Sequence, residues 1–240
     1  MIRIAVPGVK GRMGAAIASQ VLQATDLQLA LVTAKTDDPS VGTKFAATQL
    51  IIASELQDSS FDVFIDFTTP AAVMQHLDYC LHNNIAMVIG VTGFDASQLQ
   101  IITQAASRIP ILMSANMSIG VNICYKLLTQ SCKMFDNSWK VAISDVHHQH
   151  KKDSPSGTAK QLAQVIAAAR GVDVATIPIH SERLGDVVGE HSITFSNSTE
   201  TVTINHTANT RDIFALGAVN AARWIYGREP NLYNMLDVIG

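Results

Sequence analysis

The 240-residue chain has few charged residues, few aromatic residues and no long apolar run. Charged residues make up 15% of it, against about 25% in ordinary soluble proteins, and 48% are hydrophobic, which excludes a disordered chain. The net charge of −3 leaves no basic surplus for a phosphate backbone, so no nucleic-acid partner is expected. No stretch approaches the ~18 apolar residues of a membrane-spanning helix. The low charge favours self-association.

Cysteine is also scarce. Cys80, Cys124 and Cys132 show no CxxC spacing, and an odd number without a framework is typical of a reducing compartment. The apolar run at residues 1–6 is too short for a signal peptide and leads straight into a glycine turn. These features predict a cytoplasmic protein.

The first half of the chain alternates short apolar runs with helical patterns. Continuous apolar runs are typical of strands covered on both faces, and strand–helix alternation predicts a doubly wound parallel sheet of the Rossmann type, hence an α/β fold. The predicted strands are residues 2–6, 27–33, 50–53, 63–67, 86–91 and 109–113, and the predicted helices are residues 11–24, 71–82 and 97–107.

The pattern changes after residue 114. Long helical stretches now accompany strands, and one strand at 201–206 alternates between apolar and polar residues, as an antiparallel strand with one buried face does. We therefore predict a smaller α+β domain with a mixed sheet. Residues 1–116, completed by 213–240, form the predicted dinucleotide-binding domain, and residues 117–212 form the predicted substrate-binding and assembly domain.

A glycine-rich turn follows the first predicted strand and opens the first predicted helix. Gly8, Gly11 and Gly14 have the spacing G-x-x-G-x-x-G, one residue longer than the commonest dinucleotide-binding fingerprint. Such glycines let the backbone approach a pyrophosphate, and the helix N-terminus offers free N–H groups. The turn is predicted to bind a dinucleotide through Gly8, Val9, Lys10, Gly11, Arg12 and Met13. A tight turn without a ligand is the alternative.

The end of the second strand indicates the kind of dinucleotide. An acidic residue about 20 positions after the glycines would bind the ribose 2′-hydroxyl of NAD. Lys35 stands there instead and, with Arg12, suits a 2′-phosphate, which predicts NADPH as the preferred cofactor and NADH as a second one. The alternative is a solvated loop lysine. Later loops at the same sheet edge are expected to complete the site with Phe67, Thr68, Gly90, Val91, Thr92, Ser114, Ala115, Asn116 and Met117.

The polar segment 145–159 carries the densest set of chemical groups. Histidines and lysines are followed by a Ser-Gly-Thr turn that opens a helix. The backbone N–H groups of Gly157 and Thr158, with the hydroxyls of Ser156 and Thr158, predict a cradle for a carboxylate. His147, with an expected near-neutral pKa, and Lys151 are candidate proton donors. The alternative for 156–158 is a plain helix cap. No cysteine lies nearby and the spacing does not match a helical zinc site, so no metal is expected.

At this segment the chain resembles the dihydrodipicolinate reductase family. That family carries an acidic residue followed by His-His-x-x-Lys-x-Asp-Ala-Pro-Ser-Gly-Thr-Ala, and this chain has Asp145, His147, His148, Lys151 and Ser154 at the corresponding positions, with Ser154 in place of the alanine. Further motifs that resemble the family occur in the same order at residues 8–14, 66–68, 90–94, 114–122, 183–191 and 206–218.

The resemblance implies NAD(P)H-dependent reduction of 4-hydroxy-tetrahydrodipicolinate, a cyclic dicarboxylate, in lysine and diaminopimelate synthesis. It implies an acid/base role for His147 and a proton-donor role for Lys151. It implies that His148, Lys151, Ser156, Gly157 and Thr158, with Arg211 as a further contact, bind the carboxylates of the substrate. A homotetramer is also implied.

Two other functions fit a two-domain dinucleotide-binding protein. A different NAD(P) oxidoreductase, such as an amino-acid or aldehyde dehydrogenase, is expected to use a nucleophilic cysteine or a catalytic aspartate in a setting that this sequence does not show. A redox sensor that binds NADPH without turnover should lack both the anion cradle and the proton donors.

Overall fold

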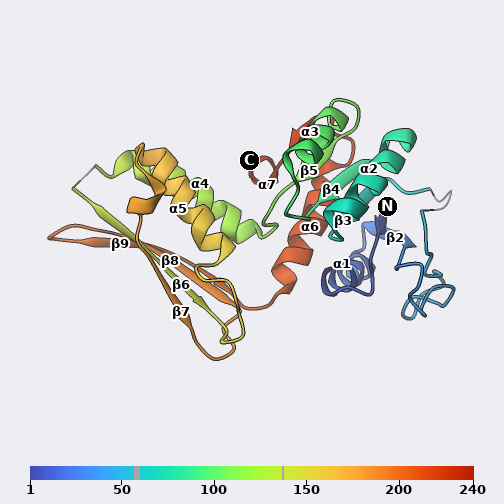
Figure 1. Ribbon diagram of the computed structural model, residues 1–240, viewed down its shortest axis with the longest axis horizontal. Helices are drawn as coiled ribbons and strands as arrows, with labels where there is room; N and C mark the ends of the chain where they lie inside the picture. The colour runs from blue at the N-terminus through green and yellow to red at the C-terminus, as the bar shows by residue number, and fades with distance from the viewer. Residues whose placement is uncertain (57–59, 137) are drawn as a thin grey trace. The chain divides into compact units, whose positions relative to one another are not determined.

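The computed structural model describes residues 1–56, 60–136 and 138–240. The chain divides into two compact units. Unit 1 comprises Met1–Met117, Phe214–Val238 and Gly240, and unit 2 comprises Ser118–Ile213 and Ile239. Figure 1 shows the order of the elements along the chain.

Unit 1 is built on a six-stranded parallel sheet. Its strands are β1 (Ile2–Val6), β2 (Leu27–Val32), β3 (Val63–Asp66), β4 (Ala86–Ile89), β5 (Ile111–Met113) and β10 (Leu232–Tyr233), in the spatial order β10-β5-β4-β3-β1-β2. The chain leaves β1 toward β2 on one side and later returns to β3 on the other. This reversal between β1 and β3 is the point at which open α/β sheets bind ligands.

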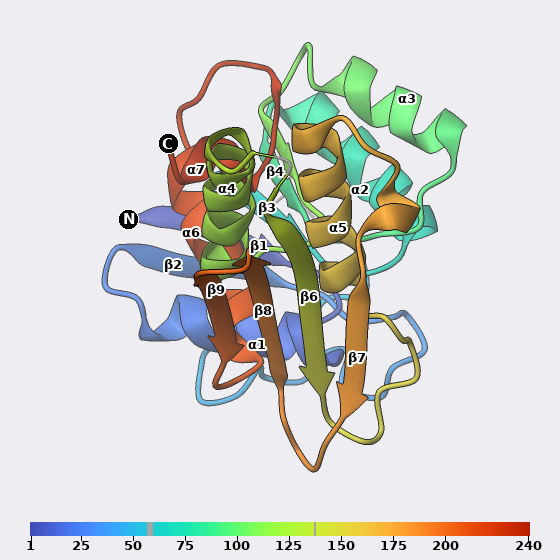
Figure 2. The same ribbon diagram turned by 90° about the vertical axis from the view of Figure 1, so that its left-hand side faces the viewer.

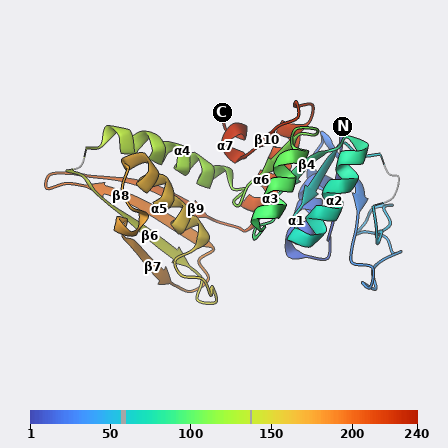
Figure 3. The same cartoon turned by 45° about the horizontal axis from the view of Figure 1, so that its top comes forward.

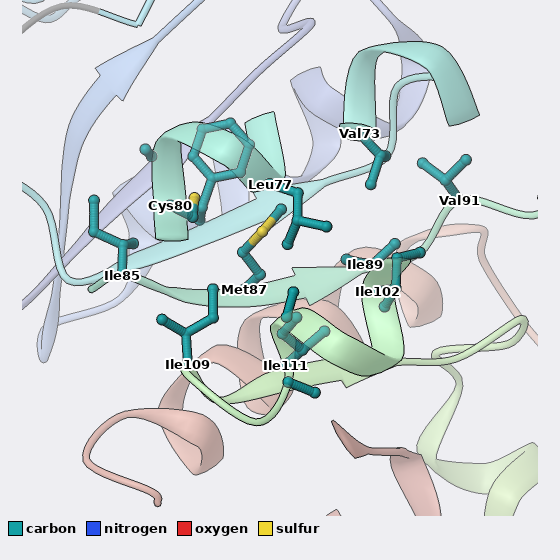
Figure 4. Close-up of a cluster of buried hydrophobic side chains, with 14 of the residues drawn as sticks. Val73, Leu77, Cys80, Ile85, Met87, Ile89, Val91, Ile102, Ile109 and Ile111 are labelled. Carbon is teal, nitrogen blue, oxygen red and sulfur yellow. The ribbon is translucent and has the colours of Figure 1, made fainter. Parts of the chain in front are cut away.

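Helices accompany the strands of unit 1. They are α1 (Arg12–Gln23), α2 (Pro70–Asn83), α3 (Ala96–Ala105), α6 (Asp212–Ile225) and the short α7 (Met235–Val238). Helices α2 and α3 lie together on one side of the sheet (Figure 3). Their apolar faces and the middle strands form an aliphatic core, in which Leu77, Cys80, Met87, Ile102 and Ile111 are all at most 1% exposed (Figure 4). This core fixes the strand ends from which the loops of unit 1 start.

Unit 2 is a mixed four-stranded sheet with two long helices on one face (Figure 2). The strands are β7 (Ile179–Arg183), β6 (Lys140–His147), β8 (Gly189–Ser196) and β9 (Thr201–Ala208), and only the pair β6–β7 is parallel. Helices α4 (Ile119–Met134) and α5 (Gly157–Arg170) pack on the sheet through a core that includes Leu128, Leu162, Ile193 and Phe195. A 3-10 turn, η1 (Val174–Thr176), precedes β7.

The predicted fold class, a Rossmann-like parallel sheet plus a smaller mixed-sheet domain, is confirmed. The predicted strand at 50–53 is wrong, because Ile51 and Ala53 form only isolated bridges, to Lys44 and Thr33. The two-residue strand β10 was not predicted, since so short an edge strand has no apolar run of its own. Among the described residues, no helix is both long enough and apolar enough to span a membrane.

Candidate active site

The glycine turn of unit 1 lies at the β1–β3 reversal. Gly8 has a φ of +63°, and the position of an added Cβ there would be only 3.1 Å from Thr68 Cγ2, in the loop after β3. A Cβ on Gly14 would lie 2.3 Å from the carbonyl oxygen of Gly8, so the first turn of α1 packs directly on the glycine turn. Gly11 caps α1 without a side-chain hydrogen bond. The N-terminus of α1 therefore has the close-packed glycine turn and the uncapped N–H groups that suit a pyrophosphate, and its role as a binding site stays a prediction.

A buried carboxylate supports the next loop. Asp66 ends β3 with no exposed surface, and its Oδ1 accepts hydrogen bonds from Thr68 N (2.9 Å) and Thr68 Oγ1 (2.6 Å). Its Oδ2 lies 2.6 Å from Nδ1 of His76 on α2. Beside this loop, a Cβ on Gly90 would lie 2.1 Å from Cζ of Phe67, so the Phe67 ring occupies the space over Gly90. The structure thus brings Phe67, Thr68 and Gly90 together.

The other predicted cofactor residues lie at the carboxyl ends of the same parallel strands. Lys10, Gly11, Arg12, Lys35, Thr92 and Ala115 are exposed. Val9, Val91 and Met117 are buried, so only their backbone groups can reach a ligand. Ser114 donates its hydroxyl to the carbonyl oxygen of Asn116 and shapes the loop after β5.

A second buried carboxylate organises unit 2. Asp145 lies on the helix-covered face of β6 with no exposed surface. Its Oδ1 accepts a hydrogen bond from Ser156 Oγ (2.7 Å), and its Oδ2 accepts from Ser156 N (3.0 Å) and Ser181 Oγ (3.2 Å). His147 Nδ1 lies 3.1 Å from Oδ1, His191 Nε2 lies 3.3 Å from Oδ1, and Arg183 Nη1 lies 3.7 Å from Oδ2. Four separate segments therefore meet at one carboxylate.

Asp145 is ionised in this setting. Burial opposes ionisation, but hydrogen bonds from His191 and Ser156 and the nearby His147 outweigh burial and hold the pKa of the Asp145 carboxyl below its usual value.

The pKa of His147 differs from the near-neutral value that the sequence led us to expect. Burial, only partly opposed by Asp145, and the neighbouring His191, Lys151 and Arg183 lower the pKa of His147 to about 4. The expected near-neutral pKa is therefore wrong for the ligand-free protein, because the sequence did not reveal the burial of this side chain. At neutral pH the ring is uncharged and can accept a proton, but it is no imidazolium donor. A bound dianion would raise its pKa again.

Ser156 is the N-cap of α5. It is 2% exposed, its hydroxyl donates to Asp145, and the same oxygen accepts a hydrogen bond from Ala159 N (3.1 Å). The Ser156 hydroxyl is thus already engaged in hydrogen bonds within the protein. The sequence had led us to expect a direct contact between this hydroxyl and a substrate carboxylate. Gly157 is exposed, and a Cβ there would contact nothing within 4 Å, so open space adjoins the first turn of α5.

Thr158 lies in the first turn of α5 and is half-buried, and the other three predicted residues of unit 2 take part in two pairs. Lys151 Nζ lies 2.8 Å from Asp153 Oδ1, and the Lys151 side chain is 22% exposed. Arg211 Nη2 lies 3.0 Å from His148 Nε2. Arg183 donates to the carbonyl oxygen of Asp153 as well as facing Asp145, and so joins the 148–154 loop to the buried carboxylate.

Among the described residues, one group has the composition of a metal site. Single ligand atoms of Asp145, His147 and His191 lie within 4.8 Å of one another. The Asp145 carboxylate already accepts three hydrogen bonds, two from Ser156 and one from Ser181, which explains the arrangement without an ion. That the site holds no metal stays a prediction.

The sequence analysis quoted Asp145 in the family signature and residues 66–68 and 183–191 as family motifs, but it assigned no supporting role to Asp66, His76, Asp145, Arg183 or His191. One signal was available for Asp145, since the period-two pattern that buries Val141 and Ile143 continues to Asp145 and His147. A charged residue on the core-facing side of a strand marks a functional or structural site.

Two family models match nearly the whole chain. The one described as "Dihydrodipicolinate reductase, N-terminus" matches residues 2–117, and the one described as "Dihydrodipicolinate reductase, C-terminus" matches residues 120–239. The chain belongs to the dihydrodipicolinate reductase family. It is thereby a member of an oxidoreductase family of lysine and diaminopimelate synthesis, and unit 1 is the Rossmann-type, NAD(P)H-binding part.

Relatives of known name agree with this assignment. Proteins named 4-hydroxy-tetrahydrodipicolinate reductase from Syntrophotalea carbinolica and Janthinobacterium sp. (strain Marseille) are each 36% identical to the chain, with 100% of the chain and 99% and 98% of the relatives covered. A dihydrodipicolinate reductase from Paenisporosarcina sp. TG-14, solved with dipicolinate bound, matches with a TM-score of 0.88 and 29% identity over 100% of both chains. The predicted family is confirmed.

Proposed function

We propose that the protein reduces 4-hydroxy-tetrahydrodipicolinate to tetrahydrodipicolinate with NADPH. The observation that supports this proposal most is the start of α5, where Asp145 holds the cap residue Ser156, in a chain whose relative was solved with a dicarboxylate bound. The segment just before α5 carries His148 and Lys151, and His148 contacts Arg211. Basic side chains and helix N–H groups together suit a doubly negative ring.

The chain's own residues have three tasks in this reaction. His148, Arg211 and the N–H groups of Gly157 and Thr158 bind the two carboxylates and orient the ring. When bound, the dinucleotide would supply a hydride, and the 4-hydroxyl, together with a proton from the ring, would leave as water. Lys151 gives a proton to the enamine-like carbon that results, and its positive charge stabilises negative density there. One hydride and one proton are thus added, and one water is lost.

Cofactor preference belongs to the same proposal. Lys35 and Arg12 are both exposed at the carboxyl edge of the parallel sheet and can form charge-assisted contacts with a 2′-phosphate. We therefore propose NADPH as the preferred cofactor, with NADH accepted.

A homotetramer in the cytoplasm completes the proposal. Within the described part of unit 2, both long helices cover the same face of the mixed sheet (Figure 2), and no helix of this unit covers the other face. The small share of charged residues supports this assignment. Light scattering of the purified protein measures the assembly; a monomeric mass at micromolar concentration would reject the tetramer.

The activity is tested by mixing the protein, NADPH and the condensation product of pyruvate and aspartate semialdehyde, and following the absorbance of reduced nicotinamide. NADPH consumption only in the presence of that product is expected. NADPH binding without consumption would favour a sensor, and consumption with an unrelated amino acid or aldehyde would favour a different oxidoreductase.

A further inference from the structure

Asp145 contacts the start of α5, to which the proposed reaction assigns carboxylate binding, and His147, to which the family resemblance assigns an acid/base role. Its Oδ1 faces both Ser156 Oγ, at the start of α5, and His147 Nδ1. We propose that Asp145 is a positioning residue: its carboxylate holds His147 in the tautomer with the proton on Nδ1, so that the lone pair on Nε2 is the group available for proton transfer. The role of His147 in proton transfer rests on the proposed function, whereas the assignment of its tautomer does not.

The orientation of the His147 ring supports this assignment. Nδ1 is buried and faces the carboxylate at 3.1 Å, although the contact lacks the alignment of a hydrogen bond. The other edge lies over Gly189, where an added Cβ would be 3.0 Å from Nε2 and 3.4 Å from Cδ2. The ring is 8% exposed, so packing holds it with Nδ1 toward the negative charge.

Electrostatics favours one tautomer in this orientation. A neutral imidazole carries its proton on one nitrogen only, and the nitrogen nearer an acceptor is the one that carries it. His147 faces one negative group, Asp145, and three groups that are cationic or can become so, His191, Lys151 and Arg183. The single carboxylate therefore decides which nitrogen is protonated. The same logic operates wherever a buried aspartate orients a histidine for proton transfer.

The same carboxylate holds the proposed anion cradle. Ser156 donates both its N–H and its hydroxyl to Asp145, and Ser156 caps α5. One ionised group thus fixes the proton acceptor and the start of the carboxylate-binding helix relative to each other within unit 2. A change at Asp145 should alter turnover and dicarboxylate binding, but not the binding of the dinucleotide.

The first test uses the wild-type protein without substrate. Long-range ¹H–¹⁵N correlation spectra of the ¹⁵N-labelled chain at pH 7.5 report the tautomer of each histidine, and His147→Gln assigns the His147 signals. We expect a protonated Nδ1 and an unprotonated Nε2. A protonated Nε2 would overturn the proposal whether or not the protein has the proposed activity.

The second test separates positioning from folding. Asp145→Asn keeps the size of the side chain and should lower kcat about 10²-fold, within the range for a positioned proton-transfer group, with the KM for NADPH unchanged. If Asp145 acts through His147, the double variant with His147→Gln should lose no more than the larger single loss. Multiplicative losses would contradict this and indicate a general structural role.

Two further variants keep the test interpretable. Asp145→Glu retains a carboxylate and should recover part of the kcat that Asp145→Asn loses, even if the asparagine variant folds poorly. His206→Gln is the matched control, because His206 pairs with His191 in the sheet and has a buried Nδ1 but does not contact Asp145; its kcat should stay within about twofold of wild type. A stoichiometric zinc ion whose removal by chelator shifts the His147 signals would replace the positioning role with a metal site.

Discussion

Within the described residues, each unit contains one fully buried aspartate that supports a hydroxyl residue and faces a histidine. In unit 1, Asp66 binds Thr68, two residues away, and His76, ten residues away. In unit 2, Asp145 binds Ser156, eleven residues away, and faces His191 and Arg183 from strands β8 and β7. The first carboxylate organises a local turn at a strand end, and the second joins four segments.

The difference shows how two kinds of site are built. A cofactor loop after a parallel strand needs only a short backbone turn, which an aspartate can support through its near neighbours. A site that binds a charged ring and moves a proton needs groups from several elements at once. The buried charge in unit 2 is stabilised by hydrogen bonds and by several cationic or titratable neighbours, as a buried carboxylate requires.

The largest effect is expected from the variant Lys151→Ala, which tests the proposed chemistry of unit 2. Loss of a positioned proton donor should lower kcat by ~10²–10⁴-fold, with the KM for NADPH unchanged. Steady-state kinetics measures this, and Lys152→Ala is the control because Lys152 is an exposed neighbour to which the proposed reaction assigns no role. Full turnover in Lys151→Ala would remove this residue from the mechanism.

The variant Gly90→Ala tests the predicted cofactor loop of unit 1. The added methyl group would collide with the Phe67 ring and displace it from the predicted cofactor loop. We expect the KM for NADPH to rise about tenfold, which corresponds to ~1.4 kcal/mol of lost binding. Gly93→Ala is no suitable control, because Gly93 has a φ of +86°. The control is a second readout: the binding of dipicolinate, which is assigned to unit 2, should stay unchanged in Gly90→Ala. An unchanged KM in Gly90→Ala would exclude Phe67 from the cofactor site.

The loss of folding stability at acid pH should come mainly from unit 2. The pKa of His147 is lowered to about 4 in the folded state, so between roughly pH 6.5 and 4 the unfolded chain binds a proton that the folded chain does not. The free energy of unfolding should therefore fall as the pH falls through this window, by on the order of 1 kcal/mol after solvent screening.

Urea unfolding at pH 7 and pH 4.5 measures this dependence. His147→Gln should reduce the difference, while the lowered pKa of His206, caused by burial and by His191, leaves a remainder of the same sign. Asp145 acts at lower pH, because a carboxyl with a lowered pKa loses its stabilisation only as the pH falls below its ordinary value. An identical pH dependence in wild type and His147→Gln would contradict the assigned burial effect.

The smallest effect is expected from Lys35→Ala. An exposed charge contact contributes little, so the preference for NADPH over NADH should fall only about three- to tenfold. Comparing kcat/KM for NADPH and NADH measures this change in preference. Lys44→Ala is the control, because Lys44 is also exposed and also follows β2. A strong NADH preference in the wild-type protein would contradict the Lys35 argument.

The sequence predicted the parts of the molecule that depend on local patterns. The apolar runs predicted most strands of the parallel sheet, and the strand–turn–helix context predicted the glycine turn at Gly8. Residues 50–53 were misassigned, because an apolar run alone does not show whether a neighbouring strand is there to pair with. The two histidines His76 and His191 were missed as support residues, since their contacts with Asp66 and Asp145 depend on tertiary packing.

The most direct test of the comparison is to titrate NADPH and dipicolinate separately into wild-type protein, Asp66→Asn and Asp145→Asn by calorimetry. If each carboxylate supports the binding of one ligand only, Asp66→Asn weakens NADPH binding about tenfold and leaves dipicolinate binding unchanged, and Asp145→Asn does the reverse. Equal weakening of both ligands by either variant, in protein that remains folded, would contradict the account.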